Sequence, residues 1–154
     1  MVESAEMMER MMAASIFEVL EKMFFIFLES GDFEQRAYAN AAVVDFQGML
    51  NGRMGLFMTR SMAQTMAANM LCISTHPVSN EIVEDCTGEA AEMICGTFLS
   101  KADPSGSSRL SLPVFYRDAA TASNEVASSP GGLESRLGFD AGMEKMGVIF
   151  RFAP

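Results

Sequence analysis

The spacing of apolar residues near the start of the chain predicts one long amphipathic helix from about Ala5 to Glu29. Apolar side chains recur every three or four positions there, which is the period of one helix face: Met8, Met12, Ile16, Leu20, Met23 and Phe27. Polar and charged residues occupy the positions between them. The segment Ser30-Gly31-Asp32 is expected to end this helix, with Gly31 as its C-terminal cap.

A β-hairpin and two further helices are predicted next. Residues 39–48 and 53–58 form β-branched and aromatic runs around the turn signal Asn51-Gly52. Ser61 and Gln64 match a capping box, which predicts a short helix running to about Cys72. A third helix is expected from about Ser79 to Lys101, where Asp103-Pro104 stops it.

The last third of the chain has the pattern of strands. Alternating apolar residues predict strands at 110–117, 133–140 and 146–152. The segment between the first two, 118–132, is rich in Ala, Ser, Gly and Asn and is expected to be a long mobile loop. The predicted order is therefore α-β-β-α-α-β-β-β. This order indicates a single α+β domain, residues 1–154, with an antiparallel-rich sheet covered by helices.

Charge and hydropathy narrow the classes of function. The net charge of −9 opposes binding to nucleic acid, because that affinity depends on clustered Lys and Arg, and it equally disfavours an anionic membrane surface. The most apolar early stretch is interrupted by Glu18, Glu21 and Lys22, so it cannot supply the ~20 apolar residues of a spanning helix. The acidic N-terminal residues do not resemble a secretory signal. We therefore expect a cytoplasmic protein with neither a nucleic-acid nor a membrane partner.

The three cysteines and fifteen methionines point to packing rather than to chemistry. Cys72, Cys86 and Cys95 are odd in number and form no Cys-x-x-Cys pair, so neither a disulfide framework nor a zinc site is predicted. We expect free, largely buried thiols. The methionines are expected to fill the core or, second, to form an adaptable contact surface.

The third helix has one apolar and one acidic face. At about 100° per residue, Asp85, Glu92 and Gly96 lie within roughly 60° of Glu89. On the other side of the helix lie the apolar residues Val83, Ala90, Ile94 and Phe98. Three carboxylates within two turns are explained as simply by an ordinary solvent-exposed helix face as by a functional site. A metal site is not predicted, because one helix supplies too few ligands and His76 is not spaced to join them.

A resemblance to a known family changes the interpretation of this helix. The stretch Glu84-Asp-Cys-Thr-Gly-Glu-Ala-Ala-Glu-Met-Ile-Cys-Gly96 resembles the signature of the CheC, CheX and FliY phosphatases. That signature is an Asp or Ser, three residues, a Glu, two residues and an Asn, commonly with a glycine four positions later. Residues 42–48, 51–58, 62–71 and 110–114 resemble the family's neighbouring strands and helix. One copy of the signature indicates the CheX-like branch.

The resemblance implies a partner and roles for the matching residues. The partner is a response-regulator receiver of the CheY type, phosphorylated on an aspartate. Glu89 would hold a lysine of the receiver, the residue at position 92 would orient the attacking water, and Asp85, Gly88 and Gly96 would contact the partner. The Mg²⁺ ion would belong to the receiver, with no intrinsic cofactor in this chain. The family also implies a homodimer formed through the sheet.

The sequence departs from the signature where the family has asparagine, because this chain has Glu92. An amide can donate and accept hydrogen bonds, whereas an ionised carboxylate only accepts them. It would also place negative charge beside a phosphoryl group. Three hypotheses therefore stay open: a phosphatase that uses Glu89 and Glu92, a receiver-binding module that has lost catalysis, and a structural dimer whose acidic helix is merely solvated.

Overall fold

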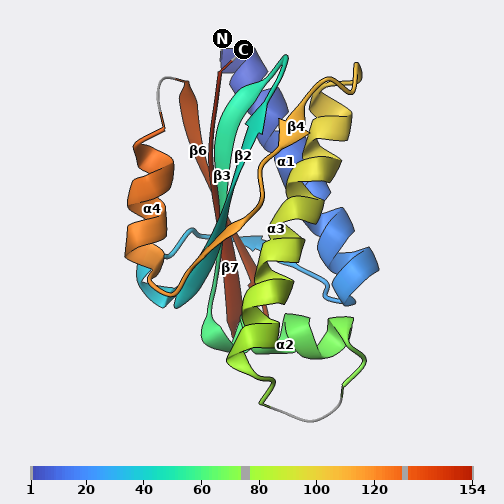
Figure 1. Ribbon diagram of the computed structural model, residues 1–154, viewed down its shortest axis with the longest axis vertical. Helices are drawn as coiled ribbons and strands as arrows, with labels where there is room; N and C mark the ends of the chain where they lie inside the picture. The colour runs from blue at the N-terminus through green and yellow to red at the C-terminus, as the bar shows by residue number, and fades with distance from the viewer. Residues whose placement is uncertain (1, 74–76, 130–131, 154) are drawn as a thin grey trace.

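A seven-stranded antiparallel sheet forms the centre of the computed structural model, which describes residues 2–73, 77–129 and 132–153 (Figure 1). The spatial order of the strands is β1-β6-β7-β3-β2-β4, and β5 also pairs with β2. Their bounds are β1 Glu29–Gly31, β2 Asn40–Gln47, β3 Asn51–Met58, β4 Arg109–Leu110, β5 Val114–Tyr116, β6 Leu133–Ala141 and β7 Glu144–Ala153. The hairpins β2–β3 and β6–β7 supply most of the sheet, and β2–β3 is the hairpin predicted from the runs at 39–48 and 53–58.

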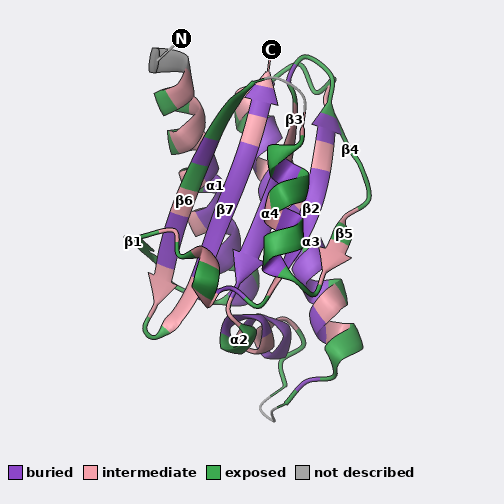
Figure 2. Cartoon of the chain, turned by 90° about the vertical axis from the view of Figure 1, so that its left-hand side faces the viewer, coloured by how far each residue is buried: buried purple, intermediate pink, exposed green. Residues whose placement is uncertain are grey.

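Helices cover both faces of the sheet, but unequally. Three of them, α1 Val2–Phe24, α2 Arg60–Met70 and α3 Asn80–Ala102, lie on one face, and α4 Ala119–Ala127 lies on the other (Figure 1). A short 3₁₀ helix, Gln35–Ala37, precedes β2. Figure 2 shows α4 over the buried central strands, with the outer part of β6 left exposed. This architecture confirms the predicted α+β class with an antiparallel sheet covered by helices.

The two-residue period of the strands divides the core into two layers. On β2, Ala42, Val44 and Phe46 join the large cluster beneath α1–α3, whereas Ala41 and Val43 face α4. Met146, Val148, Phe150 and Phe152 of β7 lie together in the larger cluster, as their alternation predicts. None of the helices in the described part of the chain combines the length and hydrophobicity needed to cross a membrane.

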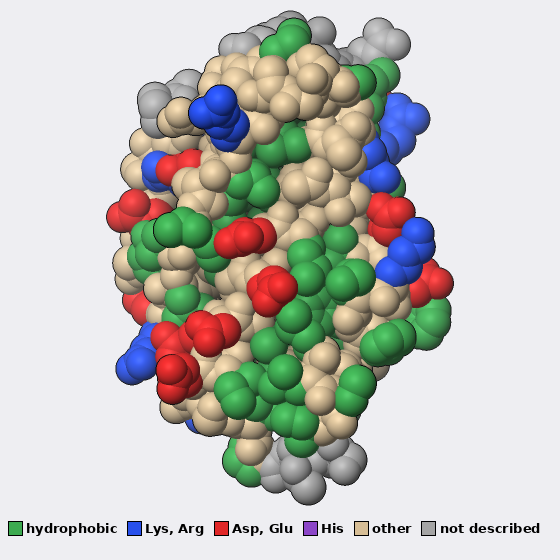
Figure 3. Space-filling view, turned by 45° about the vertical axis from the view of Figure 1, so that its right-hand side comes forward, with side chains coloured by type: hydrophobic (Ala, Val, Ile, Leu, Met, Phe, Trp, Pro, Cys, Tyr) green, Lys and Arg blue, Asp and Glu red, His purple; other side chains and the backbone are tan. Residues whose placement is uncertain are grey.

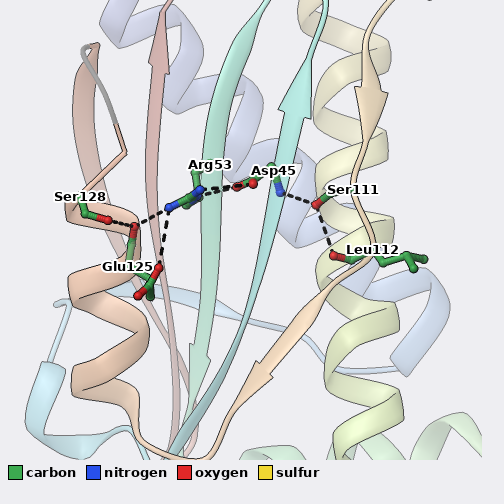
Figure 4. Close-up of polar contacts among 6 residues, drawn as sticks. All are labelled: Asp45, Arg53, Ser111, Leu112, Glu125 and Ser128. Atoms are coloured by element: carbon green, nitrogen blue, oxygen red, sulfur yellow. Dashed lines mark hydrogen bonds and ion pairs between the residues drawn. The ribbon is translucent and has the colours of Figure 1, made fainter.

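A row of charged residues crosses the α4 face of the sheet. Asp45, Arg53, Arg151 and Glu134 lie opposite one another on β2, β3, β7 and β6. Arg53 pairs with Asp45 and also donates to the Glu125 carbonyl at 2.8 Å, near the end of α4 (Figure 4). Arg151 donates to the Ala127 carbonyl at 3.1 Å. Cations at the C-terminal end of a helix compensate its unpaired carbonyls, so these two arginines tie α4 to the sheet.

Helix α4 corrects the prediction of a mobile loop at 118–132. Asp118 caps it, since its carboxylate accepts from the Ala120 N–H at 3.1 Å. Ala119, Ala122 and Val126 form its buried face. Their spacing is a helical signal, but the apolar side chains are too small to stand out among Ser, Thr and Asn. The sheet makes the helix stable, because an isolated helix of nine residues is marginal in water.

The end of α1 was also predicted wrongly. The helix stops at Phe24, because Phe25 adopts the left-handed conformation (φ 58°) and the Ile26 N–H returns to the Leu20 carbonyl at 2.9 Å. Gly or Asn normally occupies such a position, so the signal at Gly31 was misleading. Gly31 instead ends β1, a short edge strand paired with β6.

Two smaller predictions also need correction. Thr59, rather than Ser61, caps α2 by accepting from the Met62 N–H at 3.3 Å. Gln64 serves the following loop instead, since its amide exchanges two hydrogen bonds with the backbone of Val78. The strand predicted at 110–117 is divided into β4 and β5 around Pro113, which has no N–H to donate to a ladder.

Candidate functional site

Helix α3 has nearly the predicted bounds and the predicted buried face. Ser79 caps its N-terminus by accepting from the Ile82 N–H at 3.3 Å. Val83, Ala90, Ile94 and Phe98 are all buried, as the helical period requires. The Phe98 ring packs against Phe46 and Phe150 with centroid distances of 6.1 and 6.0 Å. The helix is therefore held against the sheet, and its opposite face is left available.

The outer face of α3 forms one wall of an open groove of about 420 Å³. Asp85 and Glu89 are exposed, and Glu92 is half-buried. The helix lines this groove with Glu84, Asp85, Gly88, Glu89 and Glu92. Figure 3 shows the acidic side chains (red) as a row across this face, bordered by hydrophobic side chains (green). Spacings of three and four residues thus place the carboxylates together, as predicted.

The second wall is the segment 111–115, whose Pro113 and Phe115 line the groove. Ser111 anchors it to β2: its N–H donates to the Asp45 carbonyl at 2.8 Å, and its hydroxyl accepts from the Asp45 N–H at 2.9 Å (Figure 4). Pro113 then rests on α3 at Gly88, where a Cβ would lie 3.1 Å from the proline ring. Gly88 therefore brings the two walls into contact.

Gly96 lies apart from the groove. It lines a separate hollow with Ser100, Asp103 and Leu110 at the C-terminal part of α3. A Cβ at position 96 would meet only the Leu110 side chain, at 3.8 Å, which is ordinary contact. The fold thus gathers four of the five predicted site residues (Asp85, Gly88, Glu89 and Glu92) into one groove and places Gly96 outside it.

The C-terminal end of α3 is held by a carboxylate–serine cluster. Asp103, the C-cap residue, accepts hydrogen bonds from Ser105, Ser107 and Ser108. The hydroxyl hydrogen bonds of Ser105 and Ser108 lower the pKa of Asp103 from its ordinary value. This cluster fixes the loop that leads from α3 to β4, and hence the start of the second wall.

The chemistry of the groove is that of carboxylates alone. Cys86 is buried beside it, and burial, followed by the charges of Glu89 and Asp85, raises the pKa of its thiol. Burial raises the pKa of Cys95 to about 12. Cys72 differs from the expectation of largely buried thiols, because it is exposed. Within residues 2–73, 77–129 and 132–153, no group of three or more His, Cys, Asp or Glu side chains is arranged to hold a metal ion. His76 lies outside the described residues.

Sequence reasoning missed the second wall and the basic residue beside it. Arg117 forms an ion pair with Glu84 at 3.4 Å and lies at the edge of the groove. Pro113 inside a strand-like run was a usable signal, because proline interrupts a ladder. Nothing in the local pattern indicated that this interruption lies against α3.

Comparison with known proteins agrees with the fold and with the family that the sequence resembles. The family model described as chemotaxis phosphatase CheX matches residues 40–132. The structure is similar to CheX from Vibrio vulnificus (18% identity, 93% of this chain and 97% of that chain covered, TM-score 0.73). It is also similar to the CheX–CheY–BeF₃–Mg²⁺ complex from Borrelia burgdorferi (16%, 94% and 97%, 0.70) and to FliY from Thermotoga maritima (14%, 97% and 90%, 0.66). No curated protein sequence matches the chain.

Proposed function

This chain belongs to the CheX family of chemotaxis phosphatases, and we propose that it docks a phosphorylated receiver domain of the CheY type and hydrolyses its aspartyl phosphate slowly. The observation that carries the proposal is the groove, in which Asp85, Glu89 and Glu92 project from one helix face. The Borrelia burgdorferi relative is named as a complex of CheX with CheY, which supports this class of partner.

Docking rests on Glu89 as the anchor of a receiver lysine. Its side chain is exposed near the middle of the groove, and it forms no ion pair within the described residues, so its charge is available to a partner. We propose that the Mg²⁺ ion is carried by the receiver, as the family resemblance implies. This protein would then act by positioning, without a covalent step.

Turnover is expected to be slow because of Glu92. It lies three residues after Glu89, on the same side of the helix, where the family signature has asparagine. A carboxylate there can accept a hydrogen bond from the attacking water, but it cannot donate one to the phosphoryl oxygens. Its charge also repels the phosphoryl group. The same residue favours the second candidate function, a non-catalytic module that sequesters the phosphorylated receiver.

The test measures binding and dephosphorylation separately, with a CheY-type receiver from the same genome. Binding is measured to the receiver activated with beryllofluoride and Mg²⁺, and hydrolysis with the receiver phosphorylated by a small-molecule donor. We expect wild type to bind, Glu89→Ala to bind at least tenfold more weakly, and Glu21→Ala, an exposed glutamate on α1, to behave as wild type. Absence of wild-type binding would refute the proposal. Binding with no acceleration of hydrolysis would leave the non-catalytic module.

We also propose that the protein acts in the cytoplasm, as a homodimer formed through an edge of the sheet. The edges available are β1 on one side and β4–β5 on the other, and both are short strands. Backbone groups at the edge of a sheet can pair with a second copy, and residues 133–137 of β6 extend beyond the three residues that β1 covers. Light scattering coupled to size exclusion tests the dimer, since a monomeric mass at micromolar concentration would contradict it.

A further inference from the structure

A second hollow, of about 220 Å³, continues the acidic groove past the N-terminus of α3. Glu84 and Phe115 line both, so the two form one surface. The character of the surface changes along it, because the second hollow is lined by two arginines and two asparagines: Arg60, Arg117, Asn40 and Asn80. A groove whose centre is anionic therefore has a cationic end.

Arg60 is the best placed cation of this hollow. Its side chain is exposed and forms no ion pair within the part of the chain that the structure describes. It is the first residue of α2, where the helix dipole disfavours a positive charge. Local stability thus gives no reason for an arginine at this position, whereas an anionic ligand in the hollow would.

Arg117 adds to the same preference. The Arg117 side chain is 82% exposed, and its pair with Glu84, at 3.4 Å, is an exposed ion pair of the kind that contributes little in water.

We propose that this hollow, formed around Arg60 and Arg117, binds a carboxylate side chain of the receiver and so selects among receivers by charge. The inference rests on the proposed function, because the hollow is continuous with the groove in which the receiver would dock. Asn80 and Glu89 are nine residues apart on α3, which is ~14 Å along a helix axis. The matching receiver would therefore carry an acidic residue roughly that far from the lysine held by Glu89.

A carboxylate fixed on a bound partner suits this site better than a free anion. The chain carries a net charge of −9, and Glu84 lines the hollow, so a small anion in solution would be repelled. A carboxylate on the receiver is brought to the arginines by the rest of the interface, where complementary charges set specificity and the rate of association.

The test is the charge reversal Arg60→Glu, measured as binding to the beryllofluoride-activated receiver. Glutamate at the first position of a helix is favourable, so this variant should keep its thermal stability. The control is Arg10→Glu on α1, an exposed arginine that changes the net charge equally. We expect Arg60→Glu to weaken binding about tenfold or more, Arg60→Lys to weaken it less, and the control to stay within about twofold.

A charge swap completes the experiment. Each acidic residue on the docking face of the receiver is changed to lysine, and one such change should restore binding to Arg60→Glu. Equal binding by Arg60→Glu and Arg10→Glu, with wild type bound normally, would overturn this inference and leave the proposed function intact. Absence of wild-type binding would overturn the proposed function itself. Weaker binding of Arg60→Glu with no receiver change that restores it would also overturn the carboxylate assignment.

Discussion

Replacing Glu92 by asparagine is expected to increase the rate of receiver dephosphorylation. Glu92 is half-buried in an open groove, three residues from Glu89, so a side chain at this position projects toward whatever Glu89 holds. The substitution removes a negative charge and supplies an NH₂ donor at the same place. Both changes stabilise the negative charge that the phosphoryl oxygens carry in the transition state, and so should raise the rate.

The size of the increase follows from the charge and from the exposure of the groove. Two unit charges about 4 Å apart repel by ~4 kcal/mol at an effective dielectric of about 20, and by ~1 kcal/mol in bulk water. A groove open to solvent lies between these limits. Each ~1.4 kcal/mol changes a rate about tenfold, so Glu92→Asn should accelerate hydrolysis by between about fivefold and about a thousandfold.

The assay follows loss of the phosphorylated receiver with Mg²⁺ present, at saturating concentrations of each variant so that docking does not limit the rate. Glu92→Ala separates the two contributions, because it removes the charge without supplying a donor. We expect Asn to be fastest, Ala intermediate and wild type slowest, with Glu21→Asn equal to wild type. If Glu92→Asn binds the receiver normally and is no faster than wild type, the repulsion argument is wrong.

Three further predictions concern the stability of α3, of the contact between the sheet and α4, and of the Asp103 cluster. In each, the stability is measured by urea or thermal unfolding. Gly96→Ala should stabilise the protein by about 0.5–1 kcal/mol, because it removes a helix glycine without a clash. Gly88→Ala should stabilise it clearly less, because the added Cβ would press against Pro113 in the second wall. Equal stabilisation by the two variants would contradict this reasoning. Arg53→Met should destabilise the protein by about 1–3 kcal/mol, because it removes the bonds to Asp45 and to α4. The control Arg36→Met, at an exposed position, should leave the stability nearly unchanged. Equal effects of the two substitutions would contradict this reasoning. Because hydrogen-bond donors lower the pKa of Asp103, its stabilisation is complete above the ordinary value of 3.8 and is lost as the pH falls through the folded value. The difference between wild type and Asp103→Asn should therefore be present at pH 7 and shrink on acidification; a difference that grows toward low pH would contradict the assignment.

Some features could be predicted from the sequence because each is repeated along a single element. The buried and acidic faces of α3 follow from a period of 3.6 residues, so Glu89 and Glu92 were placed correctly on one side. The β2–β3 hairpin was predicted from its β-branched and aromatic runs, although its turn lies at residues 48–50 and Asn51-Gly52, the predicted turn signal, begins β3. The alternation along β7 follows from a period of two. In these elements the pattern is strong, because large apolar side chains mark the buried face.

Other features depended on contacts between distant segments, which no local pattern describes. Helix α4 has a buried face of small side chains and is held by arginines from β3 and β7. The left-handed Phe25 and the edge strand β1 form because β6 is available to pair with the returning chain. Tertiary packing overrides weak local preferences in such segments.

The sequence alone determined the acidic helix: its limits, its buried face and the departure at Glu92 all follow from local periodicity and one short motif. The tertiary structure alone decided what faces that helix. Pro113 reaches Gly88 only because Ser111 is bonded to β2 at Asp45, and Arg60 reaches the N-terminus of α3 from another helix. The physical reason is that side-chain periodicity specifies which face of an element is buried, whereas the neighbour that covers it depends on strand pairing between residues far apart in the chain.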